Sequence, residues 1–218
     1  FFDGFRTSHE INTVEMIDLD KLHALLDRDK LAQFHDHALN PEHPLMRSTV
    51  QNPDIFFQVR ESSNPYYDNL PAIVEGYFEE INRITGRDYH LFNYYGAPDA
   101  TDVIVAMGSV AGTIKEAVDC LNAQGKKVGF VQVHLFRPFS AEHLLKAIPE
   151  SVQRIAVLDW TKEPGSVGEP LYEDICTSLS RAGRNITVIG GRFGLSSKDT
   201  DPGQILSVFA NLASAEPK

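Results

Sequence analysis

A charged loop at residues 159–170 holds the side chains best placed for chemistry. It reads Asp159-Trp160-Thr161-Lys162-Glu163-Pro164-Gly165-Ser166-Val167-Gly168-Glu169-Pro170 and directly follows the apolar run 155–158. If that run is a strand of a parallel sheet, the loop lies at the carboxyl edge, where α/β domains place their functional groups. The charges could contact a cofactor, or Asp159, Lys162 and Glu163 could pair with a neighbouring domain while the Pro-Gly pair fixes the turn. We favour the interface.

A second candidate is Arg137 in Arg137-Pro138-Phe139, which follows an apolar run at 128–135. A guanidinium donates a planar fork of hydrogen bonds and therefore suits a carboxylate or a phosphate. We count Arg137 among the candidate interface residues.

A nucleotide site at Gly108-Ser109-Val110-Ala111-Gly112-Thr113 is weakly supported. Free amides at a helix N-terminus attract phosphate, but the spacing lacks G-x-G-x-x-G and no Gly-Lys-Ser/Thr follows. The next predicted strand ends in Gln132-Val133-His134, without the carboxylate that would hold a ribose hydroxyl. Packing of a helix on a strand explains these glycines better.

Metal and hydrolase chemistry are also disfavoured. His35 and His37, with His43 nearby, lie two residues apart on a predicted helix and point about 200° apart, so they cannot chelate one ion. The only cysteines, Cys120 and Cys176, cannot supply the four ligands of a zinc site or an iron–sulfur cluster, and we expect them to be reduced and buried. No serine lies in a G-x-S-x-G elbow.

The elements that position these residues alternate between apolar strands and amphipathic helices from residue 101 onward, which is typical of a mostly parallel sheet with helices on both faces. Strands are predicted at 103–107, 128–135, 155–158 and 186–189, and helices at 110–124, 141–148, 171–180 and from Pro202. The run 89–95 alternates like a fifth strand. Its link to 103–107 is too short for a crossover helix, so we expect it to run antiparallel to the others.

Upstream, residues 18–39 predict two short helices, and an apolar stripe from Ile73 to Ile84 predicts a third with Pro71 in its first turn. The stretch 41–71, rich in Pro, Asn and Ser, is interpreted as a passage between domains. We place the boundary near Ser62, with domains at 1–61 and 62–218.

Composition excludes several classes of protein. With 218 residues and 42% hydrophobic content, the chain can bury a core. Its net charge is −10, and no basic run exceeds Lys126-Lys127, so nucleic acid is not an expected partner. No apolar run approaches the roughly 18 residues of a membrane span, so we expect a cytoplasmic protein without membrane contact. The chain starts at Phe1, and we interpret it as part of a longer polypeptide.

Three segments carry a resemblance to a known family. They are the loop 159–170, the start Phe1-Phe2-Asp3-Gly4-Phe5-Arg6-Thr7-Ser8-His9-Glu10, and Gly190-Gly191-Arg192-Phe193-Gly194-Leu195-Ser196-Ser197-Lys198. Together they resemble the pyruvate:ferredoxin (flavodoxin) oxidoreductases over nearly the whole chain. The resemblance implies a three-layer α/β/α domain like the C-terminal domain of transketolases, with a five-stranded mixed sheet in the order 1-3-2-4-5. Residues 1–61 would then end the pyrimidine-side thiamine-diphosphate domain.

The resemblance also implies a function for the parent enzyme. That enzyme is expected to be a homodimer that uses thiamine diphosphate, Mg²⁺ and [4Fe-4S] clusters to convert pyruvate and coenzyme A into acetyl-CoA. Its electrons go to ferredoxin or flavodoxin. The catalytic, cofactor and cluster residues of the family lie in parts absent from this sequence, so none is carried over. This chain is expected to bind no cofactor.

The resemblance leaves this chain a structural and interface role, inactive by itself. The candidate interface residues are Arg6, His9, Glu10, Arg137, Asp159, Lys162 and Glu163. Trp160 and His134 stand where the family more often has arginine, which leaves their roles open. Two alternatives remain: the same domain in another 2-oxoacid oxidoreductase, and a free-standing interaction module without catalysis.

Overall fold

The computed structural model describes residues 11, 13, 15–44 and 50–218. Its contacts divide the chain into two compact parts. We call His90–Lys218 the sheet unit and Thr13–Tyr89 the helical unit, and we describe each by itself.

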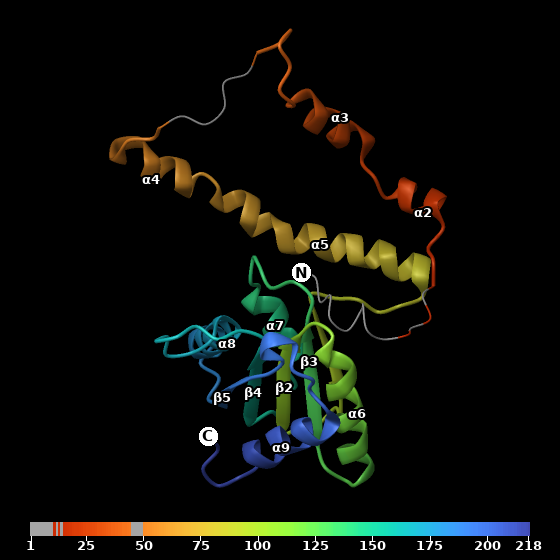
Figure 1. Cartoon of the computed structure of the whole chain (residues 1–218), viewed down its shortest axis with the longest axis vertical. Coiled ribbons are helices and arrows are strands. Elements are labelled where there is room, and N and C mark those ends of the chain that lie inside the picture. Colours follow the sequence, from red (N-terminus) through yellow and green to blue (C-terminus); the bar gives the residue numbers. More distant parts are fainter. Residues whose placement is uncertain (1–10, 12, 14, 45–49) are drawn as a thin grey trace. The chain divides into compact units, whose positions relative to one another are not determined.

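The sheet unit is built on five strands in the order β1-β3-β2-β4-β5 (Figure 1). The strands are β1 (Phe92–Gly96), β2 (Asp102–Met107), β3 (Val128–Val133), β4 (Arg154–Asp159) and β5 (Thr187–Arg192). β1 runs antiparallel to β3, and the remaining neighbours are parallel. The predicted mixed sheet, its strand order and its antiparallel first strand are confirmed.

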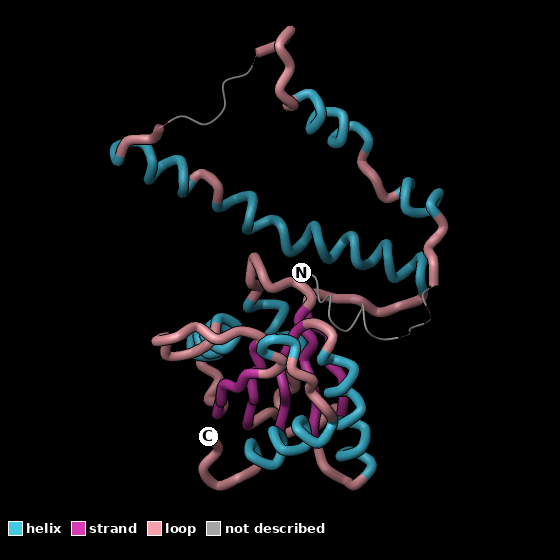
Figure 2. The backbone as a smooth tube through the Cα atoms, in the orientation of Figure 1, coloured by secondary structure: helices cyan, strands magenta, loops and turns pink. Residues whose placement is uncertain are grey.

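Two pairs of helices cover the sheet and complete three layers (Figure 2). α6 (Val110–Ala123) contacts α9 (Pro202–Leu212), and α7 (Ala141–Ala147) contacts α8 (Pro170–Arg181). Ile104 and Phe130, which pair across β2 and β3, are fully buried in the cluster that includes α6 and α9. The central strands are apolar on both faces because helices shield both from water.

β1 and β3 approach closely at a pair of glycines. Gly96 lies opposite Gly129 in the register of the two strands, and the Tyr94 hydroxyl donates a hydrogen bond to the Ala97 carbonyl. A Cβ atom on Gly129 would lie 2.7 Å from ring carbons of Tyr94. Glycine at position 129 therefore makes room for the aromatic ring.

The helical unit differs in part from the expected irregular passage at 41–71. It contains α2 (Leu19–Ala24), α3 (Arg28–Asp36), α4 (Pro53–Glu61) and α5 (Asn64–Thr85). Pro53 and a second proline at 65 occupy the first turns of α4 and α5, where an amide hydrogen bond is not required. Pro71 lies inside α5 and does not begin it, so the expected start was wrong by about two turns. α5 ends at Gly86, which adopts a φ of 70°.

None of α2, α3, α4 and α5 contains a buried residue. Large apolar side chains are exposed along all of them: Leu19, Leu22, Leu31, Phe34, Ile55, Phe56, Phe57, Val59, Tyr66, Tyr67, Ile73 and Tyr77. The boundary predicted near Ser62 falls between α4 and α5, within this unit, and stays a prediction. Across the described residues, no helix has the length and apolar character needed to cross a bilayer.

Candidate functional site

Asp159 ends β4 and holds the first turn of α8. Its Oδ1 accepts a hydrogen bond from the Leu171 amide at 3.0 Å, and its Oδ2 accepts one from the Tyr172 amide at 3.2 Å. Burial raises the pKa of Asp159, although the two amide hydrogen bonds oppose the change. Asp159 is only 5% exposed, and its carboxylate is engaged within the sheet unit, while the contact with another domain that the sequence predicts for it stays a prediction.

Glu169, the residue before α8, gathers three groups around one buried carboxylate. Its Oε2 accepts a hydrogen bond from the Glu163 amide at 2.8 Å, and its Oε1 pairs with the Arg192 guanidinium. Lys162 Nζ lies 3.8 Å from the same Oε1. Burial alone would raise the pKa of Glu169, but the Glu163 amide, Arg192 and Lys162 together lower it.

Lys162 and Glu163 lie at the surface of the loop, as an interface role requires. The Lys162 side chain is 42% exposed, and its ammonium also lies 3.5 Å from the Glu163 carbonyl oxygen. Glu163 is tied to Glu169 through its amide, while its side chain is exposed. Their contact with another part of a larger protein stays a prediction.

The tip of the loop is exposed but braced. Val167 is 97% exposed, and Gly165 adopts a φ of 89°, which favours glycine. The Ser166 hydroxyl donates to Glu173 Oε1 on α8 at 3.1 Å. In Figure 1 the loop stands out beside α8. The loop therefore exposes the apolar Val167 to solvent, while the neighbouring Ser166 is held to α8.

Trp160 joins this loop to the one that follows β5. Its indole nitrogen donates to the Gly194 carbonyl, and its ring stacks on Phe193 with centroids 6.3 Å apart. The Phe193 amide donates to the Asp159 carbonyl at 3.1 Å. These contacts give Trp160, whose role the sequence left open, the task of fixing the two carboxyl-edge loops to each other.

Arg137 forms an ion pair with Asp174, which belongs to the same unit. Its Nη1 lies 2.5 Å from Asp174 Oδ2 on α8, and its guanidinium lies 3.9 Å from the centroid of the Phe136 ring. The side chain is 53% exposed, so contact with another domain stays a prediction. The remaining interface candidates, Arg6, His9 and Glu10, lie outside the described residues.

Sequence reasoning counted Glu169 among the charges of the loop, but it missed that Glu169 is the centre of this site and that Arg192 is its partner. A signal was present, because an acidic residue before a proline and an apolar helical run marks a helix start. Arg192 lies at the end of the glycine-rich strand β5, but nothing in its local sequence indicates its partner 23 positions away.

Comparison with known proteins gives this geometry a family. Residues 100–205 match the profile "Pyruvate:ferredoxin oxidoreductase core domain II", and residues 1–79 match "Pyruvate flavodoxin/ferredoxin oxidoreductase, thiamine diP-bdg". The chain belongs to the pyruvate:ferredoxin/flavodoxin oxidoreductase family. The predicted resemblance is confirmed.

Several curated oxidoreductases of this family match over essentially the whole chain. The pyruvate-flavodoxin oxidoreductase of Enterobacter agglomerans and the pyruvate:ferredoxin oxidoreductase of Moorella thermoacetica are each 56% identical to it over 218 residues. The pyruvate-flavodoxin oxidoreductase of Klebsiella pneumoniae is 54% identical over 212 residues. The match covers 100%, 100% and 97% of this chain, but 19%, 19% and 18% of these relatives.

The described residues do not fit the metal centres of an oxidoreductase. They contain no group of three or more His, Cys, Asp or Glu side chains that could hold an ion. Cys120 on α6 is exposed and Cys176 on α8 is half-buried, so the expectation that both are buried was wrong. Cys120 lies on the outward side of its helix, where Gln124 Nε2 approaches its sulfur at 3.3 Å.

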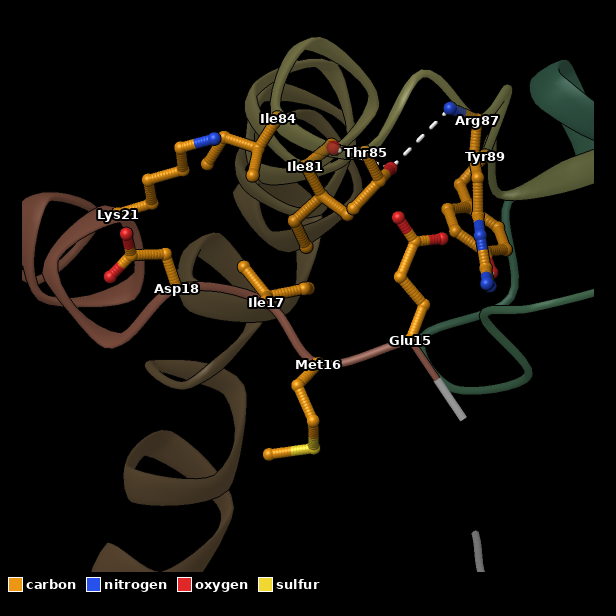
Figure 3. Close-up of a pocket in the computed structure, with 10 residues that line it drawn as sticks. All are labelled: Glu15, Met16, Ile17, Asp18, Lys21, Ile81, Ile84, Thr85, Arg87 and Tyr89. Carbon is orange, nitrogen blue, oxygen red and sulfur yellow. Dashed lines mark hydrogen bonds between the residues drawn. The ribbon is translucent and has the colours of Figure 1, made fainter. Parts of the chain in front are cut away.

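A cavity of about 300 Å³ lies in the helical unit, and its lining mixes acidic, basic and apolar side chains. Figure 3 shows the segment that holds Glu15 and Ile17 beside the end of α5, with Ile17 toward Ile81 and Glu15 toward Arg87. The Tyr89 hydroxyl, 2.5 Å from Arg87 Nη1, raises the pKa of Arg87, and Glu15 adds to the effect. The acidic Glu15 and Asp18 stand beside the cations Lys21 and Arg87 in the lining, so the formal charges of this cavity balance.

Proposed function

We propose that this chain is a scaffold and docking part of a pyruvate:ferredoxin or pyruvate:flavodoxin oxidoreductase. The whole enzyme would act as a homodimer and oxidatively decarboxylate pyruvate to acetyl-CoA, passing electrons to ferredoxin or flavodoxin. Thiamine diphosphate, Mg²⁺ and [4Fe-4S] clusters would supply that chemistry from other parts of the protein. The 218-residue chain would contribute no reacting group.

The exposed helices of the helical unit carry this proposal. α4 is exposed along its whole length, yet it presents Phe56 and Phe57, which are 50% and 67% exposed. α5 has 22 residues and no buried one, although it carries Ile73 and Tyr77. Helices gain most of their stability by packing an apolar face, and each buried Å² of apolar surface contributes roughly 25 cal/mol. Such helices are expected to pack against a further protein surface.

The length of the relatives supports the same assignment. They are about five times as long as this chain, since the match spans 19% of their length. The remaining four-fifths would supply both the covering surface and the cofactor sites.

The carboxyl edge of the sheet supports a role in positioning. In many α/β enzymes this edge carries the reacting groups. Here Asp159 binds amides of α8, and Glu169 binds Arg192 and the Glu163 amide. Groups held in this way build a rigid surface.

Activity and cofactor binding of the 218-residue chain test the first half of the proposal. Pyruvate-dependent reduction of an electron acceptor is assayed beside a full-length relative as the positive control. Calorimetry with thiamine diphosphate and Mg²⁺, and cluster absorbance after reconstitution with iron and sulfide, accompany it. We expect no turnover, no binding and no cluster. Stoichiometric binding of either cofactor would contradict the proposal.

A charge placed on α4 tests the docking half. Phe57→Glu should barely change the melting temperature of the 218-residue chain, because Phe57 is 67% exposed there. In the full-length enzyme it should lower assembly and activity, since a carboxylate would be buried in an apolar contact. Gln58→Glu adds the same charge at an exposed neighbour and serves as the control. Equal behaviour of the two full-length variants would count against docking through Phe57.

A further inference from the structure

A cavity of about 370 Å³ opens between the end of the sheet and α9, beneath the turn that follows β5. Its lining includes the apolar side chains of Leu158, Ile205 and Val208. The charged side chains of Arg192, Lys198 and Asp199 also line it. The volume lies at the lower end of the range of roughly 300–1,000 Å³ that small-molecule sites occupy.

The cations at this cavity have unused hydrogen-bonding capacity. Within the described part of the chain, Lys198 Nζ has no carboxylate or carbonyl partner, and Arg192 uses only Nε, toward Glu169. Lys162 shares that carboxylate at 3.8 Å. These five charged groups therefore sum to +1, because three cations stand against Glu169 and Asp199.

The turn above the cavity has an unusual backbone. Gly194 has a φ of 64°, and Ser196 and Ser197 have φ values of 55° and 60°. Residues with a Cβ atom rarely adopt this region, and such conformations gather at ligand clamps and active sites. Trp160 fixes the start of the turn by donating to the Gly194 carbonyl. The turn that borders the cavity therefore has a constrained backbone, and the lining also carries charged side chains.

We propose that this cavity binds a small organic acid, with its carboxylate held by Lys198 and the two terminal nitrogens of Arg192. The apolar body of the acid lies against Leu158, Ile205 and Val208. The proposed docking role does not use Lys198, and it uses Arg192 only through Nε, so the two proposals stand or fall separately.

Hexanoate is the probe, because it joins a carboxylate to an apolar body. Amide chemical shifts of the 218-residue chain are followed during titration, with hexan-1-ol as the neutral comparison. We expect saturable shifts at Gly194, Leu195 and Lys198. Hexanoate should bind about tenfold more tightly than the alcohol, because hydrogen bonds between charged groups are roughly twice as strong as neutral ones.

Two lysine variants locate the binding site. Lys198→Gln should lower hexanoate affinity toward that of the alcohol and leave alcohol binding unchanged. Lys126→Gln removes an equal charge at the turn after α6, outside the lining, and should have no effect on either probe. Equal affinity for the two probes, no saturable shift, or equal losses in both variants would overturn the proposal.

A measurement on the full-length enzyme shows whether the cavity is open to a free acid or is filled by another segment of the same protein. Saturation transfer from the protein to hexanoate should be seen in the full-length enzyme and should be lost in its Lys198→Gln variant. If hexanoate binds the 218-residue chain but not the full-length enzyme, a segment of the longer protein fills the cavity. The assignment to a free small molecule would then be wrong.

Discussion

The buried carboxylate of Glu169, directly before α8, is paired with the guanidinium of Arg192, the last residue of β5. This ion pair joins the end of the loop after β4 to the start of the loop after β5. Trp160 makes a second link between the same loops through Gly194. The carboxyl edge of the sheet is thereby held at two points, and each can be tested by substitution.

Glu169→Gln is expected to destabilise the chain at neutral pH and to have less effect in acid. The pKa of Glu169 is lowered in the folded state, so its contribution is present above the ordinary value of 4.5 and is lost as pH falls through the folded pKa. Thermal unfolding between about pH 7 and about pH 3 measures the difference from the unsubstituted chain. Glu150→Gln, at a side chain 95% exposed, is the control. A difference that stays constant with pH would argue against the ion pair.

Gly194→Ala is expected to destabilise the chain by about 1–3 kcal/mol, the usual cost of placing a Cβ at a strained backbone position. Gly194 has a φ of 64°, and an added Cβ would lie 2.9 Å from Trp160 Nε1. Because Trp160 is the only tryptophan, its fluorescence reports directly on this contact. We expect a shifted emission maximum together with the lower stability. Gly165→Ala is the control, because its added Cβ would meet nothing within 4 Å. It should destabilise the chain through its positive φ without the spectral change.

Arg154→Ala is expected to lower the free energy of unfolding by about 2 kcal/mol, below the range for fully buried pairs because the Arg154 side chain is 31% exposed. Arg154 binds both oxygens of Asp102, at 2.5 and 2.8 Å, and Asp102 is buried at the start of β2. Urea unfolding measures the change. Lys127→Ala breaks an exposed pair with Asp99 and should cost about 1 kcal/mol or less. Equal costs would contradict the difference in burial.

Lys162→Ala should leave the melting temperature of the 218-residue chain nearly unchanged. The Lys162 side chain is 42% exposed, and its ammonium lies 3.8 Å from a carboxylate that keeps Arg192 and the Glu163 amide as closer partners. Such a long, half-exposed contact contributes about 1 kcal/mol or less. In the full-length enzyme the same substitution is expected to weaken assembly or activity. Unfolding of the chain combined with normal full-length assembly would show that Lys162 braces its own unit only.

Truncation tests the predicted boundary near Ser62. We expect residues 62–217 to fold without residues 1–61, and limited proteolysis of the whole chain to cut first between Asn40 and Leu70. A second truncated chain, residues 90–217, corresponds to the sheet unit. If only 90–217 folds cooperatively by calorimetry, the boundary belongs near residue 89 and not near 62.

The sheet could be predicted from the sequence because its strands are short apolar runs between glycines and polar turns. β4, for example, was expected at 155–158 and is found at Arg154–Asp159. The antiparallel β1 followed from the short link before β2, while the strand order came from the resemblance. The helix α4 and the start of α5 were missed because the proline-rich stretch 41–71 was interpreted as an irregular passage, although the prolines at 53 and 65 lie in first turns, where a helix permits them. Pro71 was expected in the first turn of a helix and lies inside α5.

The sequence predicted the position of the candidate site, in the loop after β4, but not the contacts that its side chains make with one another. Asp159 was recognised by its place after a strand, yet its burial depends on α8 folding back over β4. The pairing of Glu169 with Arg192 joins residues 23 positions apart and is set by the adjacency of β4 and β5. Local spacing contains no information about such a contact.

The position of β3 between β1 and β2 also imposes an order of events on the growing chain. Among the strands that the structure describes, β1 pairs with β3 alone, and the last residue of β3 is made 37 residues after the end of β1. At the usual rate of about 5–20 residues per second, β1 waits on the order of seconds for its partner. During this interval Leu91 and Phe92, which are buried in the finished protein, face solvent. The start of the sheet unit is therefore most vulnerable to aggregation during its own synthesis, before Val133 has left the ribosome.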